Sequence, residues 1–81
     1  MIRWKITEMI GRYQMETGKR LTVAGLASKA GIARSSVNMA ACGHTKRIDF
    51  DTLNKLVGFF ERELEGSITV GDLLEYIPDH N

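Results

Sequence analysis

Cysteine and long apolar runs are scarce in this chain of 81 residues. Its single cysteine, Cys42, cannot form a disulfide within the chain, which is typical of proteins from a reducing compartment. No apolar run approaches the roughly 18 residues that a membrane-spanning helix needs. The first segment, MIRWKITEMIGRYQ, is periodic rather than uniformly apolar, so it does not resemble a signal peptide. We therefore expect a cytoplasmic protein without a membrane partner.

The sequence also lacks a residue pattern typical of catalysis or of metal binding. Cys42 and His44 are two residues apart but have no convincing third partner for a metal site or a nucleophile. Glu61, Glu63 and Glu65 read as a run of solvated acids. Glycine-rich phosphate loops of the nucleotide-binding types are absent. We expect no enzymatic activity, no metal and no cofactor.

The small net charge of +1 conceals a division between two parts of the chain. Residues 1–47 hold nine lysines and arginines against two acids, a balance of +7. Residues 48–81 hold two basic residues against eight acids, a balance of −6. A basic half suits a polyanion, although scattered solvated charges can also segregate by chance.

Apolar residues recur at helical spacing in five segments, and no stretch alternates for long enough to indicate a sheet. The first stripe begins at Ile2 and continues to Tyr13, with Gly18 ending the helix. The other helices are expected over 22–30, 34–41, 50–65 and 69–77, the last one ended by Pro78. The sequence thus predicts a single all-α domain, residues 1–81, in which five helices surround one core.

The spacing from Val23 to Cys42 is the most informative feature. Two short helices that cross steeply need a small residue where their backbones approach, and Ala27 provides it. The tight turn between them needs a residue that tolerates positive φ, and Gly31 provides it. Apolar residues stand at the positions that must hold both helices on the core. We therefore predict a helix-turn-helix unit over residues 22–42.

Five stretches carry a resemblance to a known family: the opening MIRWKI, the unit LTVAGLASKAGIARSSVNM, the basic loop GHTKRID, and DTLNKLVGFF followed by VGDLLEYIPD. Together they resemble the lambda-repressor-like (Cro/repressor, XRE-type) helix-turn-helix family. The resemblance implies a compact five-helix domain that binds double-stranded DNA sequence-specifically. It therefore implies a transcriptional regulator, acting as a repressor or autoregulator.

In that family the second helix of the motif lies in the major groove of DNA. The implied base contacts are Arg34, Ser35 and Met39. The implied contacts to the DNA backbone are Lys19, Arg20, Ser36, Asn38, His44, Thr45, Lys46 and Arg47. For Arg34 a phosphate contact is almost equally expected, and for Met39 simple exposure or core filling stays open.

One such module contacts only a few base pairs, so a homodimer on an approximately palindromic operator is expected. The half-sites would lie about 34–36 Å apart, one turn of the double helix. The dimer surface is not evident from the sequence. The candidates are the apolar residues of the last two predicted helices, for which a place in the core is the alternative: Phe59, Leu64, Ile68, Tyr76 and Ile77.

Four positions depart from the family pattern: Val23, Gly25, Ala33 and Met39. Family members usually carry a polar residue at the position of Val23 and often an acid at that of Gly25. They commonly carry a helix-capping Ser or Thr at the position of Ala33, and a long polar side chain that contacts bases at that of Met39. The apolar stretch NMAAC favours a second hypothesis, in which the same scaffold binds protein as an antitoxin-like or accessory partner. The basic loop and the charge of residues 1–47 favour DNA.

Overall fold

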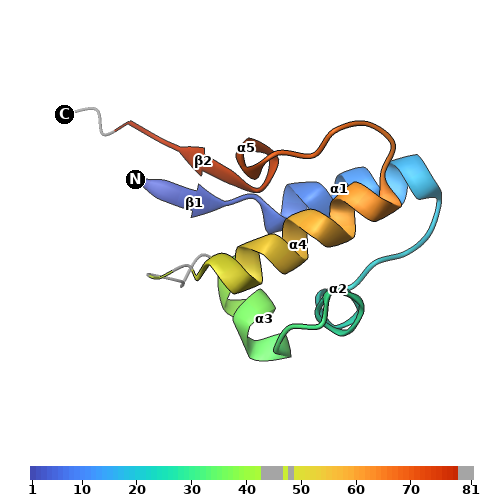
Figure 1. Cartoon of the computed structure of the whole chain (residues 1–81), viewed down its shortest axis with the longest axis horizontal. Coiled ribbons are helices and arrows are strands. Elements are labelled where there is room, and N and C mark those ends of the chain that lie inside the picture. Colours follow the sequence, from blue (N-terminus) through green and yellow to red (C-terminus); the bar gives the residue numbers. More distant parts are fainter. Residues whose placement is uncertain (43–46, 48, 79–81) are drawn as a thin grey trace.

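The computed structural model describes residues 1–42, 47 and 49–78. Of the described residues 64% are helical, and two short strands complete the structure. In chain order the elements are β1 (Ile2–Trp4), α1 (Ile6–Thr17), α2 (Val23–Ala30), α3 (Arg34–Cys42), α4 (Phe50–Glu63), α5 (Val70–Leu73) and β2 (Leu74–Tyr76). Figure 1 shows α1 and α4 along the long axis, with α2 and α3 on one side and the strands with α5 on the other.

The core lies between α1 and α4 and extends to the inner faces of the other helices. The ring of Tyr13 stacks on Phe59 with 5.8 Å between centroids, and Phe59 meets Phe60 edge to face at 5.1 Å. Burying an apolar side chain of this size stabilises the fold by about 1.5–3 kcal/mol. The predicted single core is therefore present, and it contains these three aromatic rings together with Trp4 of β1.

Two helix starts follow the predicted capping pattern. The hydroxyl of Thr22 accepts a hydrogen bond from the Gly25 N–H at 3.0 Å, and α2 begins directly after it. The carboxylate of Asp49 accepts from the Thr52 N–H at 2.7 Å, and α4 begins there. These bonds satisfy backbone donors that have no partner inside the helix.

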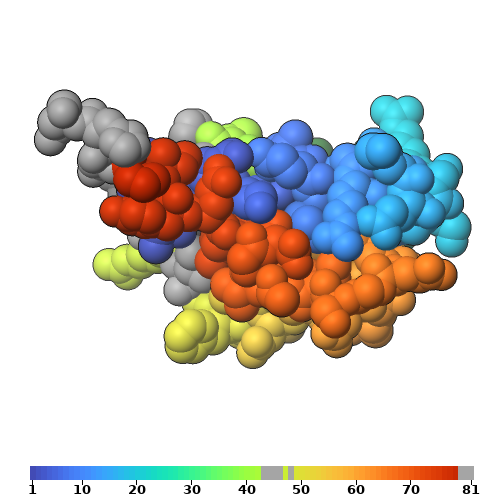
Figure 2. Space-filling view, turned by 90° about the horizontal axis from the view of Figure 1, so that it is seen from above, coloured from blue at the N-terminus to red at the C-terminus, as the bar shows by residue number. Residues whose placement is uncertain are grey.

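The two ends of the chain form a β-ribbon, so the prediction of an all-α chain is wrong there. β1 and β2 are antiparallel, with Ile2 opposite Tyr76, Arg3 opposite Glu75 and Trp4 opposite Leu74. In Figure 2 the C-terminal segment, in red, lies against the N-terminal segment, in blue. The molecule is mostly helical with one small sheet.

Both ribbon strands fall inside segments that were expected to be helical. Helix α1 begins at Ile6 instead of Ile2, and α5 is only one turn long before the chain becomes extended at Leu74. The N–H of Lys5 donates to the carbonyl of Leu73 at 2.7 Å, which joins the two strands where they meet the helices. A strand of three residues is too short for its alternation to be distinguished from a helical stripe.

Helix α4 ends at Glu63, two residues before the predicted Glu65. Its C-terminal neighbour Leu64 is extended and buried, so the chain turns toward the core at this point. The expected terminator Gly66 has φ 94° and lies in the following loop.

Three of the five candidate dimer residues belong to the core. Phe59, Leu64 and Ile68 are 2%, 5% and 5% exposed, so none is available for a second chain. Tyr76 and Ile77 are 69% and 39% exposed at the end of the ribbon. The expectation is therefore wrong for the first three residues.

Among the described residues, none of the helices combines the length and the apolar character needed to cross a membrane.

Two glycines provide a matched test of backbone conformation. Gly11 lies inside α1 and Gly31 has φ 75°, and a Cβ added at either would meet no atom within 4 Å. Gly11→Ala should raise the free energy of unfolding by about 1 kcal/mol, because alanine loses less backbone entropy in a helix. Gly31→Ala should lower it by about 1–2 kcal/mol, because a Cβ is strained at positive φ. Urea denaturation measures both, and changes of the same sign would contradict this explanation.

Asp72 should make the fold sensitive to acid. Its carboxylate accepts from the Thr69 N–H at 2.8 Å, which holds the pKa of Asp72 below its ordinary value. A lowered pKa in the folded state gives stability that is complete above the ordinary value and is lost as the pH falls through the folded value. Asp72→Asn should therefore reduce the free energy of unfolding at pH 7 and flatten its decline below about pH 4. Denaturation curves at several pH values test this, and parallel curves for both proteins would contradict it.

Candidate nucleic-acid interface

The turn between α2 and α3 is built as the sequence predicts. Gly31 adopts the left-handed conformation, and the carbonyl of Ala27 accepts from the N–H groups of Gly31 and Ile32, both at 3.0 Å. These bonds end α2 and redirect the chain within three residues. Helix α3 then begins at Arg34.

The inner faces of both helices are closed against the core. Leu26 and Ala27 of α2 and Val37 and Ala40 of α3 are each at most 5% exposed. The small side chain of Ala27 lies on this buried face, as the close approach of the helices requires. The burial fixes which face of α3 points outward.

The outer face of α3 is exposed along its whole length. Val37 and Ala40 are buried and Ala41 is half-buried. All the remaining residues of the helix are exposed: Arg34, Ser35, Ser36, Asn38, Met39 and Cys42. Met39 is 50% exposed, so it does not fill the core.

The predicted contact residues that the structure describes lie in three places. Arg34, Ser35, Ser36, Asn38 and Met39 lie together on α3. Lys19 and Arg20 lie in the loop between α1 and α2, at the end of the long axis away from the ribbon, and both are exposed. Arg47 is also exposed, whereas His44, Thr45 and Lys46 lie outside the described residues.

The loop with Lys19 and Arg20 borders a shallow hollow of about 520 Å³ that is open to solvent. Gln14 and Gly18 complete its lining, and the side-chain oxygen of Gln14 accepts from the Leu21 N–H at 3.0 Å. This bond anchors the loop just before α2, so the two cations project from a fixed segment of backbone. The hollow is a surface feature and does not enclose a small molecule.

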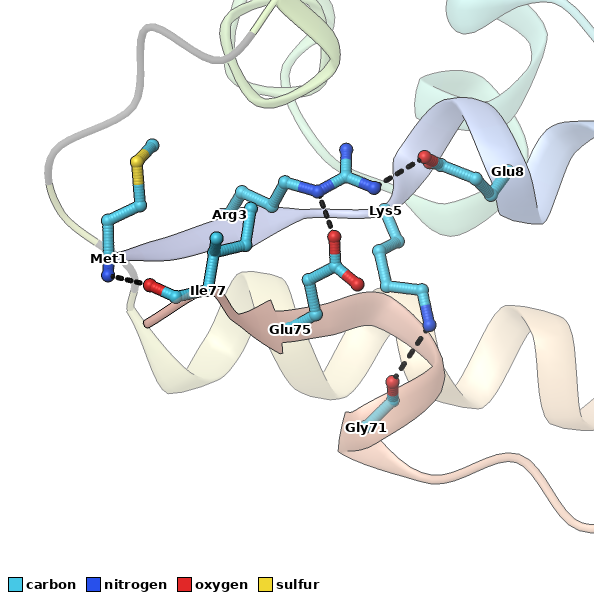
Figure 3. Close-up of polar contacts among 7 residues, drawn as sticks. All are labelled: Met1, Arg3, Lys5, Glu8, Gly71, Glu75 and Ile77. Carbon is cyan, nitrogen blue, oxygen red and sulfur yellow. Dashed lines mark hydrogen bonds and ion pairs between the residues drawn. The ribbon is translucent and has the colours of Figure 1, made fainter. Parts of the chain in front are cut away.

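The basic residues on the ribbon side are engaged by carboxylates or by a backbone carbonyl. Arg3 forms ion pairs with Glu75 and with Glu8, the latter at 2.8 Å, and hydrogen bonds to these carboxylates raise the pKa of Arg3 (Figure 3). Lys5 donates to the carbonyl of Gly71 at 3.3 Å in the same figure. These two cations, which are among the nine of residues 1–47, are therefore already engaged within the molecule.

Arg12 is engaged in the same way. Its guanidinium donates to Glu16 at 2.6 Å and lies 3.8 Å from a carboxylate oxygen of Asp72. The pairs of Arg3 with Glu75 and of Arg12 with Asp72 join the basic half of the sequence to the acidic half. Part of the charge division seen in the sequence is thus cancelled in the folded molecule.

The cations within and beside α2 and α3, unlike Arg3 and Arg12, are not paired with carboxylates in the described part of the chain. Within the described part of the chain none of them forms an ion pair, and all are exposed: Lys19, Arg20, Lys29, Arg34 and Arg47. Arg62 on α4 is similar, but it stands between Glu61 and Glu63 in the sequence. The free positive charge is therefore concentrated on the segments before, within and after the α2–α3 unit. Sequence spacing could not reveal this, because pairing depends on which segments meet in space.

No group of three or more His, Cys, Asp or Glu residues within the described ranges is arranged to hold a metal ion. Cys42 is exposed at the end of α3. Its possible partner in the sequence, His44, falls outside the ranges that the structure describes.

Comparisons with family models, with curated proteins and with solved structures found no match to this chain.

The start of α3 yields a prediction about stability. The carbonyl of Ala33 accepts from the N–H groups of Ser36 and Val37, but an alanine side chain cannot cap the helix. Ala33→Ser should therefore raise the free energy of unfolding by about 1 kcal/mol. Thr22→Ala, which removes the existing cap of α2, is the matched control and should lower it by a similar amount. Thermal and urea unfolding measure both, and destabilisation by Ala33→Ser would show that this helix start has no room for a cap.

Proposed function

We propose that this chain is a transcriptional regulator that binds double-stranded DNA sequence-specifically through α3, on a lambda-repressor-like scaffold. The observation that carries the proposal is the distribution of free positive charge. Cations on the ribbon side are engaged by carboxylates or carbonyls, whereas those around α2 and α3 are exposed without ion pairs among the described residues. A surface that neutralises phosphates needs unpaired lysine and arginine side chains.

In the proposed complex α3 enters the major groove, which is wide enough for an α-helix. Arg34 and Ser35 stand in its first turn, where recognition helices of this type face base edges. Arg34 can donate two hydrogen bonds to a guanine or can bind a phosphate. Met39 can contact a thymine methyl group.

The contacts to the DNA backbone come from the flanking segments. Lys19 and Arg20 approach from the loop before α2, and Arg47 from the segment after α3. Ser36 and Asn38 on α3 are further donors, and His44, Thr45 and Lys46 are included on the basis of the sequence. These contacts set the affinity and its salt dependence, because every neutralised phosphate releases counterions.

The regulatory part of the proposal is repression or autoregulation by a cytoplasmic homodimer. One α3 covers only a few base pairs, so two copies on an approximately palindromic operator would provide sufficient specificity. A protein bound to such a site can exclude other proteins from the same DNA. The proposal includes no catalytic step and no cofactor.

One observation favours a different function. Met39 is half exposed and Cys42 is exposed, so part of the outer face of α3 is weakly polar. Exposed methionine is frequent on surfaces that bind protein partners. In this alternative the α2–α3 unit binds a protein and binds DNA weakly or not at all.

Binding to random-sequence duplex DNA at two salt concentrations separates the two functions. We expect measurable affinity at low salt that falls steeply as salt increases, because the contacts are mainly to phosphates. Arg47→Ala should weaken binding to all sequences similarly and reduce the salt slope by about 1. Arg12→Ala is the matched control and should change neither quantity, because this guanidinium is engaged by Glu16 and Asp72.

Fluorescence anisotropy with a labelled duplex measures both quantities. Undetectable affinity at low salt, or an affinity that does not depend on salt, would contradict DNA binding and favour the protein-binding alternative.

A further inference from the structure

The burial pattern of α3 determines which residues lie at the centre of its outer face. Successive residues of an α-helix are rotated by about 100°, and the buried Val37 and Ala40 define the inward direction. Ser35 and Cys42 then point within about 10° of the opposite, outward direction. Asn38 and Met39 lie about 50° to either side of it. These four residues form what we call the outer stripe of α3.

Arg34 lies about 90° from the outward direction, at the edge of the exposed face. Ser36 lies at the other edge, about 110° away. When the middle of such a face meets a groove, the edges meet its walls, where the phosphates are. Arg34 is therefore better placed for a phosphate than for a base, and the outer stripe is better placed for the bases.

The chemistry of the outer stripe is uncharged. Ser35 and Cys42 are short, so they allow the helix backbone to approach the floor of a groove closely. Asn38 is the only one of the four whose side chain carries a donor and an acceptor on separate atoms, so it can donate to and accept from one base edge at the same time. None of the side-chain hydrogen bonds among the described residues involves Asn38, so its amide is not already engaged there.

A side-chain amide matches one base in the major groove. Asparagine can donate to N7 and accept from the N6 amino group of adenine at the same time. A methionine side chain can cover the C5 methyl group of thymine, which no other DNA base carries. Guanine instead suits the fork of an arginine, and the outer stripe contains none.

We infer that the outer stripe of α3 selects A·T base pairs, with Asn38 reading an adenine and Met39 covering a thymine methyl group. This inference rests on the proposed function and specifies the DNA that the same site takes. It moves Asn38 from the backbone contacts to the base contacts, and it assigns Arg34 to a phosphate.

The first experiment selects bound duplexes from a random library with the wild-type chain. We expect A·T pairs to be enriched in each half-site. Asn38→Ala should reduce the preference for adenine at one position by roughly tenfold, as expected for the loss of a bidentate contact. Ser36→Ala removes a proposed backbone contact at the edge of the same helix; it should weaken binding to all sequences alike and leave the base preferences unchanged.

Single-atom changes in the selected duplex then test each contact. Replacing the contacted adenine with 7-deazaadenine removes the N7 acceptor and should weaken the wild type but not Asn38→Ala. Replacing the contacted thymine with uracil removes only the methyl group and should weaken the wild type about fourfold, the value expected for one buried methyl group. The same replacement should not affect Met39→Ala. Coupling of this kind identifies a direct contact.

The outcomes separate this inference from the proposed function. Selected half-sites dominated by G·C pairs, or equal effects of the modified bases on wild type and variants, would overturn the A·T assignment while DNA binding stands. Absence of binding to any duplex at low salt would overturn both. Circular dichroism of every variant verifies that it retains the helical fold.

Discussion

The structure depends on the burial of one face of two helices that are too short to be stable alone. Helices α2 and α3 have eight and nine residues, and isolated helices shorter than about 12–15 residues are marginal in water. They persist because Leu26, Val37 and Ala40 are covered by the rest of the core. The same burial leaves the opposite face of α3 exposed and outside the core, so that face is accessible to a partner.

The local features of this unit could be predicted from the sequence because each has a local cause. A threonine hydroxyl caps α2, a glycine with positive φ ends it, and apolar spacing selects the buried residues of α3. The predicted start of α3 at Arg34 agrees with the structure. The exposure of Arg34, Ser35 and Met39 follows from the same spacing, although the function of these residues stays a prediction.

The features that the sequence did not reveal depend on contacts between distant segments. The ribbon pairs residues 2–4 with residues 74–76, and neither segment indicates a strand by itself. The ion pair of Arg3 with Glu75 exists only because this ribbon forms. For the same reason the charge of residues 1–47 overestimated the free positive charge, which is smaller and more localised than the composition suggests.

The ribbon also makes the structure of residues 2–4 and that of residues 74–76 depend on each other. Each strand is three residues long and its partner lies 70 or more positions away. Neither strand has another neighbour in a sheet among the described residues. Bringing such distant segments together costs loop-closure entropy, which is recovered only after the helices between them have assembled. Because each strand has only the other as its partner in the sheet, neither strand can stay paired when the other is lost. A change that weakens one strand therefore loosens both and also exposes Trp4, the aromatic side chain that the ribbon contributes to the core.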